Sequence, residues 1–196
     1  QEAIEICQDG DTVLVASGRY EGTIQFRGDA IVVGSLFITT RDPQYISSTV
    51  LDGGEENRVI EVTRGEWRET IVSGFTIENG TGREGGGIFI YNSGPSIEYC
   101  KIINNSGEDG GGAIYSYGGS PWINNCTIVN NSSGEGNGGL YGKNMSTFYL
   151  SNTILWNNEG DQVEFSGDLE MCNAYIDFCL IQDGENGVNV NFNGNV

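Results

Sequence analysis

One strand-like pattern recurs along this chain at a nearly constant interval. Its copies read "VSGFTIENG", "IEYCKIINN", "INNCTIVNN", "LSNTILWNN" and "IDFCLIQDG", and they start at Val72, Ile97, Ile123, Leu150 and Ile176. Successive starts lie 25, 26, 27 and 26 residues apart. Within each copy, apolar or small residues occupy alternate positions, which is the period of a β-strand. Strands that return at such a fixed interval are typical of a solenoid, in which each coil stacks on the one before it.

A second strand in each repeat follows a cluster of glycines. It reads "GGGIFIY", "GGAIYSY" and "GGLYGK", and its aliphatic residues Ile88, Ile114 and Leu140 are 26 residues apart. Short strands in every repeat favour parallel pairing between equivalent segments of neighbouring coils, about 4.8 Å apart. The pattern therefore predicts an all-β fold, a parallel β-helix (solenoid) of about 7 coils.

The two ends of the chain differ in character. At the start, Ala3, Ile4 and Cys7 have helical spacing, so residues 1–10 are predicted to form a short N-terminal capping helix. Residues 11–196 then form one β-helix domain, whose first coils are less regular and are interrupted by a polar excursion at 40–48. The last segment, "VNVNFNGNV", alternates like a strand and would leave an open edge. We therefore expect the chain to be a fragment of a longer protein.

Asparagine recurs where a strand of each repeat ends. Asn79, Asn104, Asn130, Asn157 and Asp183 fall in one column. Asn tolerates left-handed backbone angles, and stacked amides can hydrogen-bond from coil to coil, so we interpret the column as a structural Asn ladder. The alternative is N-glycosylation, because "NGT", "NNS", "NCT", "NSS" and "NMS" fit the acceptor pattern.

Several motifs resemble one known family. The stretch "QEAIEICQDGDTVLVASGRYEG", the segments "VLDGG" and "SGFTIENG", and the repeated glycine clusters followed by strands like "INNCTIVNN" are similar to secreted right-handed β-helix proteins of bacteria with a pectin-lyase-like fold. The resemblance covers essentially the whole chain. It implies a right-handed coil and export to the medium or the cell surface. It implies less about activity, because such repeats occur in adhesins and in carbohydrate-active enzymes alike.

The charge of the chain limits its partners. Asp and Glu total 27 against 9 Lys and Arg, which gives a net charge of −18. Such a chain repels nucleic acid, anionic membrane surfaces and polyuronates, whereas neutral glycans and proteins meet no such barrier. No apolar run is long enough for membrane insertion. The five cysteines are odd in number and lack the CxxC spacing of a zinc site.

The sequence offers no recognisable catalytic constellation. It contains no histidine, which excludes Ser-His-Asp and Cys-His nucleophiles. A polysaccharide lyase needs a basic side chain beside a cation site, but the basic residues beyond position 70 fall in different columns: Arg83, Lys101 and Lys143. The arginines of "NRVIEVTRGEWRET" are interpreted as part of a mixed-charge surface excursion. No pair of carboxylates has the arrangement of a glycoside hydrolase. We therefore assign no catalytic residue, and a polysaccharide lyase is the favoured alternative if the protein is an enzyme.

Acidic residues gather at the turn before the second strand in successive repeats. Stacked carboxylates concentrate negative charge that solvent or a cation must offset, and oxygen ligands suit calcium. The candidate calcium ligands are Glu84, Glu108, Asp109, Glu135, Glu159 and Asp161. Their spacing differs from the nonapeptide calcium repeat, so the competing interpretation is a solvated acidic edge and a protein without cofactors.

Aromatic residues form columns beside these turns. If the aliphatic residues of the second strand point inward, alternation sends the residues between them outward. These candidate ligand-binding residues are Phe89, Tyr91, Tyr115, Tyr117 and Tyr141. Outward rings can stack on sugars or contact a protein, and the alternative is a stabilising ladder covered by loops. A further apolar column, Ile103, Val129 and Trp156, indicates either a contact surface or packing beneath a loop.

We therefore expect a non-catalytic, extracellular β-solenoid module of a bacterial surface or secreted protein. It would act as a rigid spacer and as an adhesin-like face that binds glycans or other surface proteins. Two alternatives stay open: a carbohydrate-active enzyme domain, either a polysaccharide lyase or a glycoside hydrolase, and the subunit of a filament that self-assembles end to end or side by side.

Overall fold

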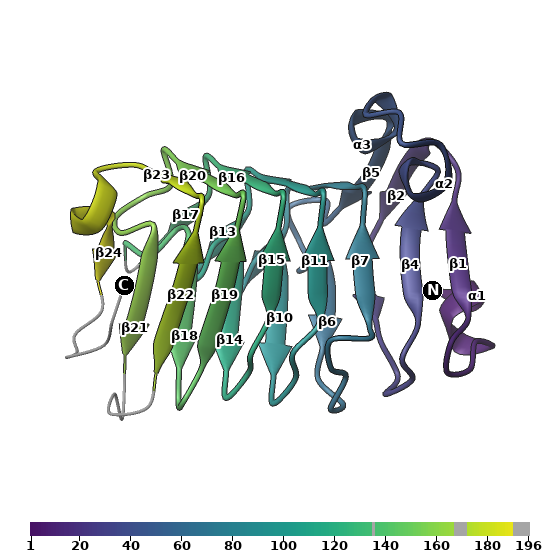
Figure 1. Cartoon of the computed structure of the whole chain (residues 1–196), viewed down its shortest axis with the longest axis horizontal. Helices are drawn as coiled ribbons and strands as arrows, with labels where there is room; N and C mark the ends of the chain where they lie inside the picture. The colour runs from purple at the N-terminus through teal and green to yellow at the C-terminus, as the bar shows by residue number, and fades with distance from the viewer. Residues whose placement is uncertain (135, 167–171, 190–196) are drawn as a thin grey trace.

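The computed structural model describes residues 1–134, 136–166 and 172–189, and it is a parallel β-solenoid whose coils stack along one axis (Figure 1). Three long parallel sheets of seven strands each form its sides. Sheet A contains β1 (Thr12–Val15), β4 (Val32–Ser35), β7 (Ile71–Ser73), β11 (Ser96–Glu98), β15 (Trp122–Asn124), β19 (Thr147–Ser151) and β22 (Asn173–Asp177). Sheet B contains β2 (Gly18–Glu21), β5 (Thr49–Asp52), β8 (Thr76–Glu78), β12 (Lys101–Ile103), β16 (Thr127–Val129), β20 (Ile154–Trp156) and β23 (Leu180–Ile181). Sheet C contains β3 (Ile24–Gln25), β6 (Ile60–Val62), β10 (Ile88–Tyr91), β14 (Ile114–Tyr117), β18 (Leu140–Lys143), β21 (Val163–Ser166) and β24 (Val188–Asn189).

A fourth, short sheet, sheet D, adds a side to the middle coils. It contains β9 (Thr81–Gly82), β13 (Ser106–Gly107) and β17 (Ser132–Ser133). In these coils the chain passes through sheets A, B and D and returns to sheet C through a glycine-rich turn. The expected all-β parallel β-helix is confirmed. The regular turns number about five rather than about seven, because the two rows that contain β1 to β6 are less regular.

The repeat positions pair in register, and this pairing builds the core. In sheet B, Ile102 pairs with Ile77 on one side and with Ile128 on the other, and all three side chains are fully buried. The same holds in sheet C for the predicted column Ile88, Ile114 and Leu140. Burial of each such side chain contributes roughly 1.5–3 kcal/mol. Columns of buried aliphatic residues therefore both fix the register and supply much of the driving force for folding.

Residues in the left-handed backbone conformation turn the chain where the strands of sheet B end. The predicted column adopts this conformation, with φ between 52° and 63° at Asn79, Asn104, Asn130, Asn157 and Asp183. Part of the predicted ladder is present, because Asn157 Nδ2 donates to Asn130 Oδ1 at 2.7 Å. A second amide ladder, which is buried, lies one residue further along the chain. Asn105 Nδ2 donates to Asn131 Oδ1 at 3.0 Å, and Asn131 Nδ2 donates to Asn158 Oδ1 at 2.9 Å. The two columns differ in burial: the amides of this second ladder are shielded from water, whereas Asn104, Asn130 and Asn157 are exposed to it. Hydrogen bonds of the buried ladder therefore contribute more to stability.

The N-terminal helix is shorter than expected. Helix α1 spans Glu2–Glu5 rather than residues 1–10, and it contributes Ile4 to the core. The polar excursion forms two short helices, α2 (Phe37–Thr40) and α3 (Gln44–Ser48), which project from the edge between sheets A and B near the N-terminal end (Figure 1). A 3-10 helix, η2 (Gly184–Gly187), precedes β24. The remainder of the expected last strand, residues 190–196, lies outside the described residues. Within the described part of the chain, no helix is long and apolar enough to cross a membrane.

Candidate functional site

Sheet C carries one of the expected aromatic columns, and the structure covers most of it. Phe89, Tyr115 and Tyr141 pair in register across β10, β14 and β18. Contrary to the expectation, Tyr115 and Tyr141 do not offer ring faces at the surface, because they are only 1% and 4% exposed. Alternation sends them away from the core, but the glycine-rich turns fold over them. A Cβ atom on Gly110 would lie 2.6 Å from the Tyr141 ring, so only glycine permits this close approach.

Polar contacts hold this covered column in place. The Tyr115 hydroxyl donates to the Glu84 carboxylate at 3.3 Å, and the Tyr141 hydroxyl lies 2.5 Å from Ser166 Oγ. Burial, and next the negative charge of Glu84, raise the pKa of the Tyr115 hydroxyl. These features correspond to the alternative interpretation of the column, a stabilising ladder covered by loops.

The second expected column is partly accessible. Tyr91 is exposed and Tyr117 is half-buried at the ends of β10 and β14. Their rings stack with centroids 5.5 Å apart and an angle of 16° between the planes. Each ring therefore covers one face of the other. The role of Tyr91 and Tyr117 in ligand binding stays a prediction.

The acidic turns do not converge on one point. Asp109 pairs with Arg83, with Nε and Oδ2 2.7 Å apart, and Glu159 accepts the backbone N–H of Ser133 at 3.0 Å. Glu135 lies outside the described residues. Among the residues that the structure describes, no three His, Cys, Asp or Glu side chains gather as metal ligands would. Calcium binding at these turns thus stays an expectation to be tested.

The mixed-charge segment around and after β6 is more buried than expected. Glu66 is 1% exposed and accepts the backbone N–H groups of Gly28 at 2.9 Å and Arg64 at 2.7 Å. The Ser93 hydroxyl donates to the same carboxylate at 3.2 Å. A buried carboxylate needs such donors to replace water. Through these hydrogen bonds, Glu66 links its own loop to the loops that contain Gly28 and Ser93.

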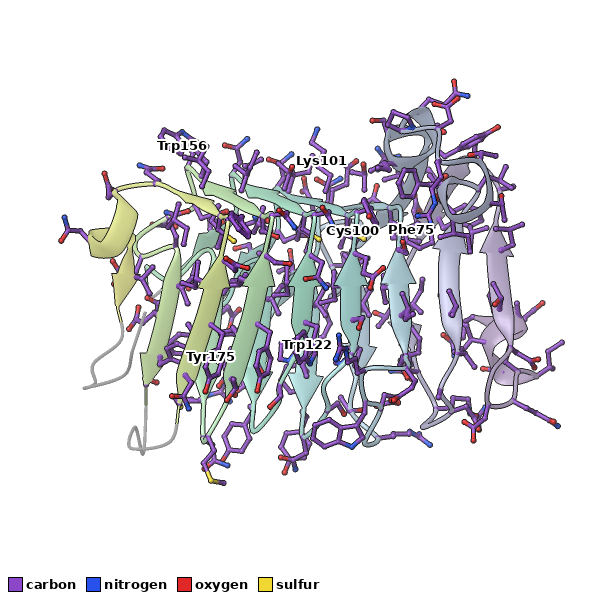
Figure 2. The ribbon with its side chains drawn as sticks, in the orientation of Figure 1. Phe75, Cys100, Lys101, Trp122, Trp156 and Tyr175 are labelled. Atoms are coloured by element: carbon purple, nitrogen blue, oxygen red, sulfur yellow. The ribbon has the colours of Figure 1, made fainter. Side chains whose placement is uncertain are left out.

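An aromatic stack that the sequence interpretation missed stands on the outer face of sheet A. Trp122, Tyr149 and Tyr175 pair in register across β15, β19 and β22, and Figure 2 shows Trp122 and Tyr175 on this face. The centroids of Trp122 and Tyr149 are 4.1 Å apart with planes at 5°, and those of Tyr149 and Tyr175 are 5.0 Å apart with planes at 6°. The Arg68 guanidinium lies 4.0 Å from the centroid of the Trp122 ring.

The stacking geometry determines which ring surfaces a ligand can reach. Nearly parallel planes at this separation mean that the rings lie face to face along the solenoid axis, about one coil spacing apart. Arg68 lies over a face of Trp122, and Tyr149 lies between its two neighbours. Tyr175, at the end of the stack, is 55% exposed. The stack therefore offers one ring face and a row of ring edges.

A groove of about 480 Å³ runs beside this stack. The three rings line it together with a polar column of Asn124, Ser151 and Asp177, two positions further along each strand. The Ser151 hydroxyl donates to Asn124 Oδ1 at 2.5 Å, and Asp177 is exposed. Apolar ring surface beside amide, hydroxyl and carboxylate groups is the chemistry that binds polyhydroxylated ligands.

The sequence does contain a signal for this stack. Each ring directly precedes the inward aliphatic residue of its repeat, at Ile123, Leu150 and Ile176. Alternation around these residues sends the preceding side chain outward. The aromatic residues before them therefore could have been aligned in one column, as those of the second strand were.

Two of the buried cysteines, Cys100 and Cys126, are unsuited to nucleophilic chemistry. All five are free thiols, and Cys100, Cys126 and Cys172 are buried. Burial raises the pKa of Cys100 to about 12 and raises that of Cys126 well above its ordinary value. Because the thiolate is the reactive species, Cys100 and Cys126 are poor nucleophiles in the folded protein.

Comparison with known proteins adds one finding. A family model described as "Right handed beta helix region" matches residues 58–196, which is more than half of the chain. No curated protein and no solved structure matches the chain significantly.

Proposed function

Because the chain belongs to the right-handed beta helix family, we propose that it is a non-catalytic β-solenoid module whose sheet A face binds glycans. In this proposal the module belongs to an exported bacterial protein, at the cell surface or in the medium, and its stacked coils act as a rigid spacer. The resemblance of the sequence to secreted β-helix proteins supports this location.

The observation that carries the proposal is the groove beside Trp122, Tyr149 and Tyr175. A sugar ring has an apolar C–H face that packs on an aromatic face, and Tyr175 presents such a face. The hydroxyl groups of that sugar can then reach Asp177, and further units of the same glycan can reach Ser151 and Asn124 in the preceding coils. The net charge of −18 favours neutral glycans over uronates.

The spacing of the site favours a linear ligand. Coils recur every ~4.8 Å along the axis, which is close to the length of one hexose unit in an extended chain. A glycan that lies along the groove would therefore meet an equivalent polar side chain at each coil.

Titration of neutral oligosaccharides tests the proposal. Those retained on a glycan array are titrated into the wild-type chain and into Tyr175→Ser, which places in β22 the residue that Ser96 provides at the same register position. We expect Tyr175→Ser to weaken binding about ten-fold, which corresponds to ~1.4 kcal/mol. The matched control is Leu14→Ser, because Leu14 lies on β1 of the same sheet and is 47% exposed.

Three outcomes would overturn the proposal. They are the absence of binding to neutral glycans, an equal loss of affinity in both variants, and the release of cleaved oligosaccharides by the wild-type chain. The last outcome would establish an enzyme instead of a binding module.

A further inference from the structure

A second surface stands out on sheet B, at the end of the solenoid opposite α1. Its large apolar side chains are exposed on β20, on β23 and in the turn before β23, and they are Ile154, Trp156, Phe178 and Leu180. Figure 2 shows Trp156 pointing away from the core at this edge. The column Ile103, Val129 and Trp156, predicted from the sequence, leads into this patch, and its first two members are half-buried. We call the four exposed residues the sheet B patch.

Phe178 has a conformation that its side chain does not favour. It is 83% exposed, and its φ of 53° lies in the left-handed region, where bulky residues are rare. In the two preceding coils the same position is occupied by Asn125 and Asn152, which tolerate this conformation well. Phe178 thus combines backbone strain with an exposed ring, a combination typical of functional positions rather than of structural ones.

The molecule itself shows what such a ring can bind. Tyr99 holds the equivalent position three coils earlier and is also left-handed, with φ of 52°. Its ring packs against Phe37 of α2, with centroids 4.9 Å apart, and the Arg41 guanidinium lies 5.9 Å from its centroid. The excursion of α2 and α3 thus covers this edge of the solenoid with an aromatic and an arginine side chain.

The same excursion also covers the adjoining part of sheet B. The outward-facing Thr76 on β8 is buried, and its hydroxyl donates to the Ile46 carbonyl of α3 at 2.9 Å. The register places Leu180 and Ile154 in the column of Thr76, nearer the C-terminal end. There the column is apolar and exposed.

An apolar surface of this kind fits either a second copy of the chain or a different protein, and the charge beside it distinguishes the two. Asp177 directly precedes Phe178, Asp183 follows β23, and both are exposed. Two copies of a chain with a net charge of −18 would bring these carboxylates toward each other, which opposes self-association. A cationic partner gains from the same charges.

We propose that the sheet B patch docks a protein segment that presents aromatic and arginine side chains. The partner's aromatic ring packs on Phe178 as Phe37 packs on Tyr99, and its arginine lies over the ring and near Asp177. The patch lies on sheet B whereas the glycan groove lies on sheet A, and Asp177 borders both. The docking proposal rests on Phe178 and its apolar neighbours and does not depend on the proposed function.

Synthetic peptides of equal length test the docking site. One contains phenylalanine and arginine, the second contains phenylalanine and glutamate, and the third contains alanine and arginine. Their binding to the full chain is followed by fluorescence anisotropy. We expect the first peptide to bind at least about ten-fold more tightly than the other two.

The matched variant is Phe178→Asn, because asparagine is the residue of the two preceding coils and suits the left-handed backbone. We expect it to keep the melting temperature of the wild-type chain and to weaken binding of the first peptide about ten-fold. The control Ile6→Ser removes an equally exposed side chain, 83% exposed, at the other end of the solenoid and should leave binding unchanged.

The proposal is overturned if Phe178→Asn binds the first peptide as tightly as the wild-type chain does. It is also overturned if the first and third peptides, the two that contain arginine, bind equally, because simple charge attraction would then suffice. Sedimentation that shows a wild-type dimer, lost in Phe178→Asn, would assign the patch to a second copy of the chain instead.

Discussion

Asn131 illustrates what a single side chain does in a stacked coil. Its Oδ1 accepts the backbone N–H and the Nδ2 of Asn105, while its Nδ2 donates to the Ile102 carbonyl and to Asn158 Oδ1. The residue is 1% exposed, so these groups have no access to water. One amide therefore satisfies buried polar groups of the coils on both sides, which links neighbouring coils beyond their backbone pairing.

Asn131→Ala should lower the free energy of unfolding by about 2–4 kcal/mol, because it leaves buried donors and acceptors without partners. The control is Asn130→Gly at the exposed neighbouring position, where φ of 58° suits glycine, and we expect a change within about 0.5 kcal/mol. Urea unfolding followed by circular dichroism measures both. Equal costs for the two variants would contradict the assignment of the ladder to the buried column.

Buried thiols should make stability depend on alkaline pH. Burial raises the Cys100 pKa from 9.0 to about 12 and also raises that of Cys126. The protonated thiols therefore contribute fully to the free energy of unfolding below the pKa of the unfolded chain. This contribution is lost as the pH rises from about 9 toward the pKa of the folded state. Cys126→Thr should reduce the loss of stability between pH 8 and pH 10 by about 1 kcal/mol.

Thr is the conservative replacement because Thr153 holds this position in the next coil, where its hydroxyl donates to the Ser151 carbonyl at 2.9 Å. Urea midpoints at the two pH values provide the measurement. If wild type and variant lose stability in parallel, the thiol at position 126 is not responsible.

At the scale of an element, the glycine turns determine how the coils close. A Cβ atom on Gly112 would lie 2.1 Å from the Ser132 carbonyl oxygen, a backbone atom that cannot move aside alone. Gly112→Ala should therefore cost about 2 kcal/mol or more of unfolding free energy and loosen the cover over Tyr141. At Gly18 the nearest atom is 3.4 Å away in the Tyr20 ring, so Gly18→Ala should be tolerated. Thermal melting compares the two, and an unchanged midpoint for Gly112→Ala would refute the steric argument.

The strands and their register were predictable from sequence because the pattern repeats. Alternation and the interval near 26 residues place Ile88, Ile114 and Leu140 on top of one another, as the structure has them. Alternation gives the direction of a side chain but not what lies above it. The burial of Tyr115 and Tyr141 depends on a turn whose path is set by glycine contacts between coils, and no local pattern encodes that path.

The candidate site was harder to predict for a related reason. Each ring of the sheet A stack belongs to a different repeat, and the equivalent position is Ser96 in an earlier coil. The stack therefore has no consistent residue type along the whole chain. Helices α2 and α3 escaped prediction as well, because segments of four or five residues are too short for helical periodicity.

At the scale of the whole molecule, the net charge of −18 means that carboxylates far outnumber basic side chains, and the excess negative charges repel one another. Self-repulsion of this kind lowers stability and is screened by salt. We expect the melting temperature to rise by several degrees as NaCl increases from about 0.02 to 0.5 M. At equal ionic strength, CaCl₂ should give no larger shift than MgCl₂, because the acidic turns of the described residues do not converge on a cation. A rise specific to calcium would establish the metal site expected from the sequence.

The residue-by-residue register also bears on how such a molecule changes over generations. Excision of residues 97–122 would join Ser96 to Ile123, the residue that pairs with Ile97, so the seam would resemble an existing junction. Recombination between neighbouring gene segments can therefore add or remove a coil in one event, without a new core having to arise. Each coil gained or lost in this way would change the length of the solenoid by ~4.8 Å.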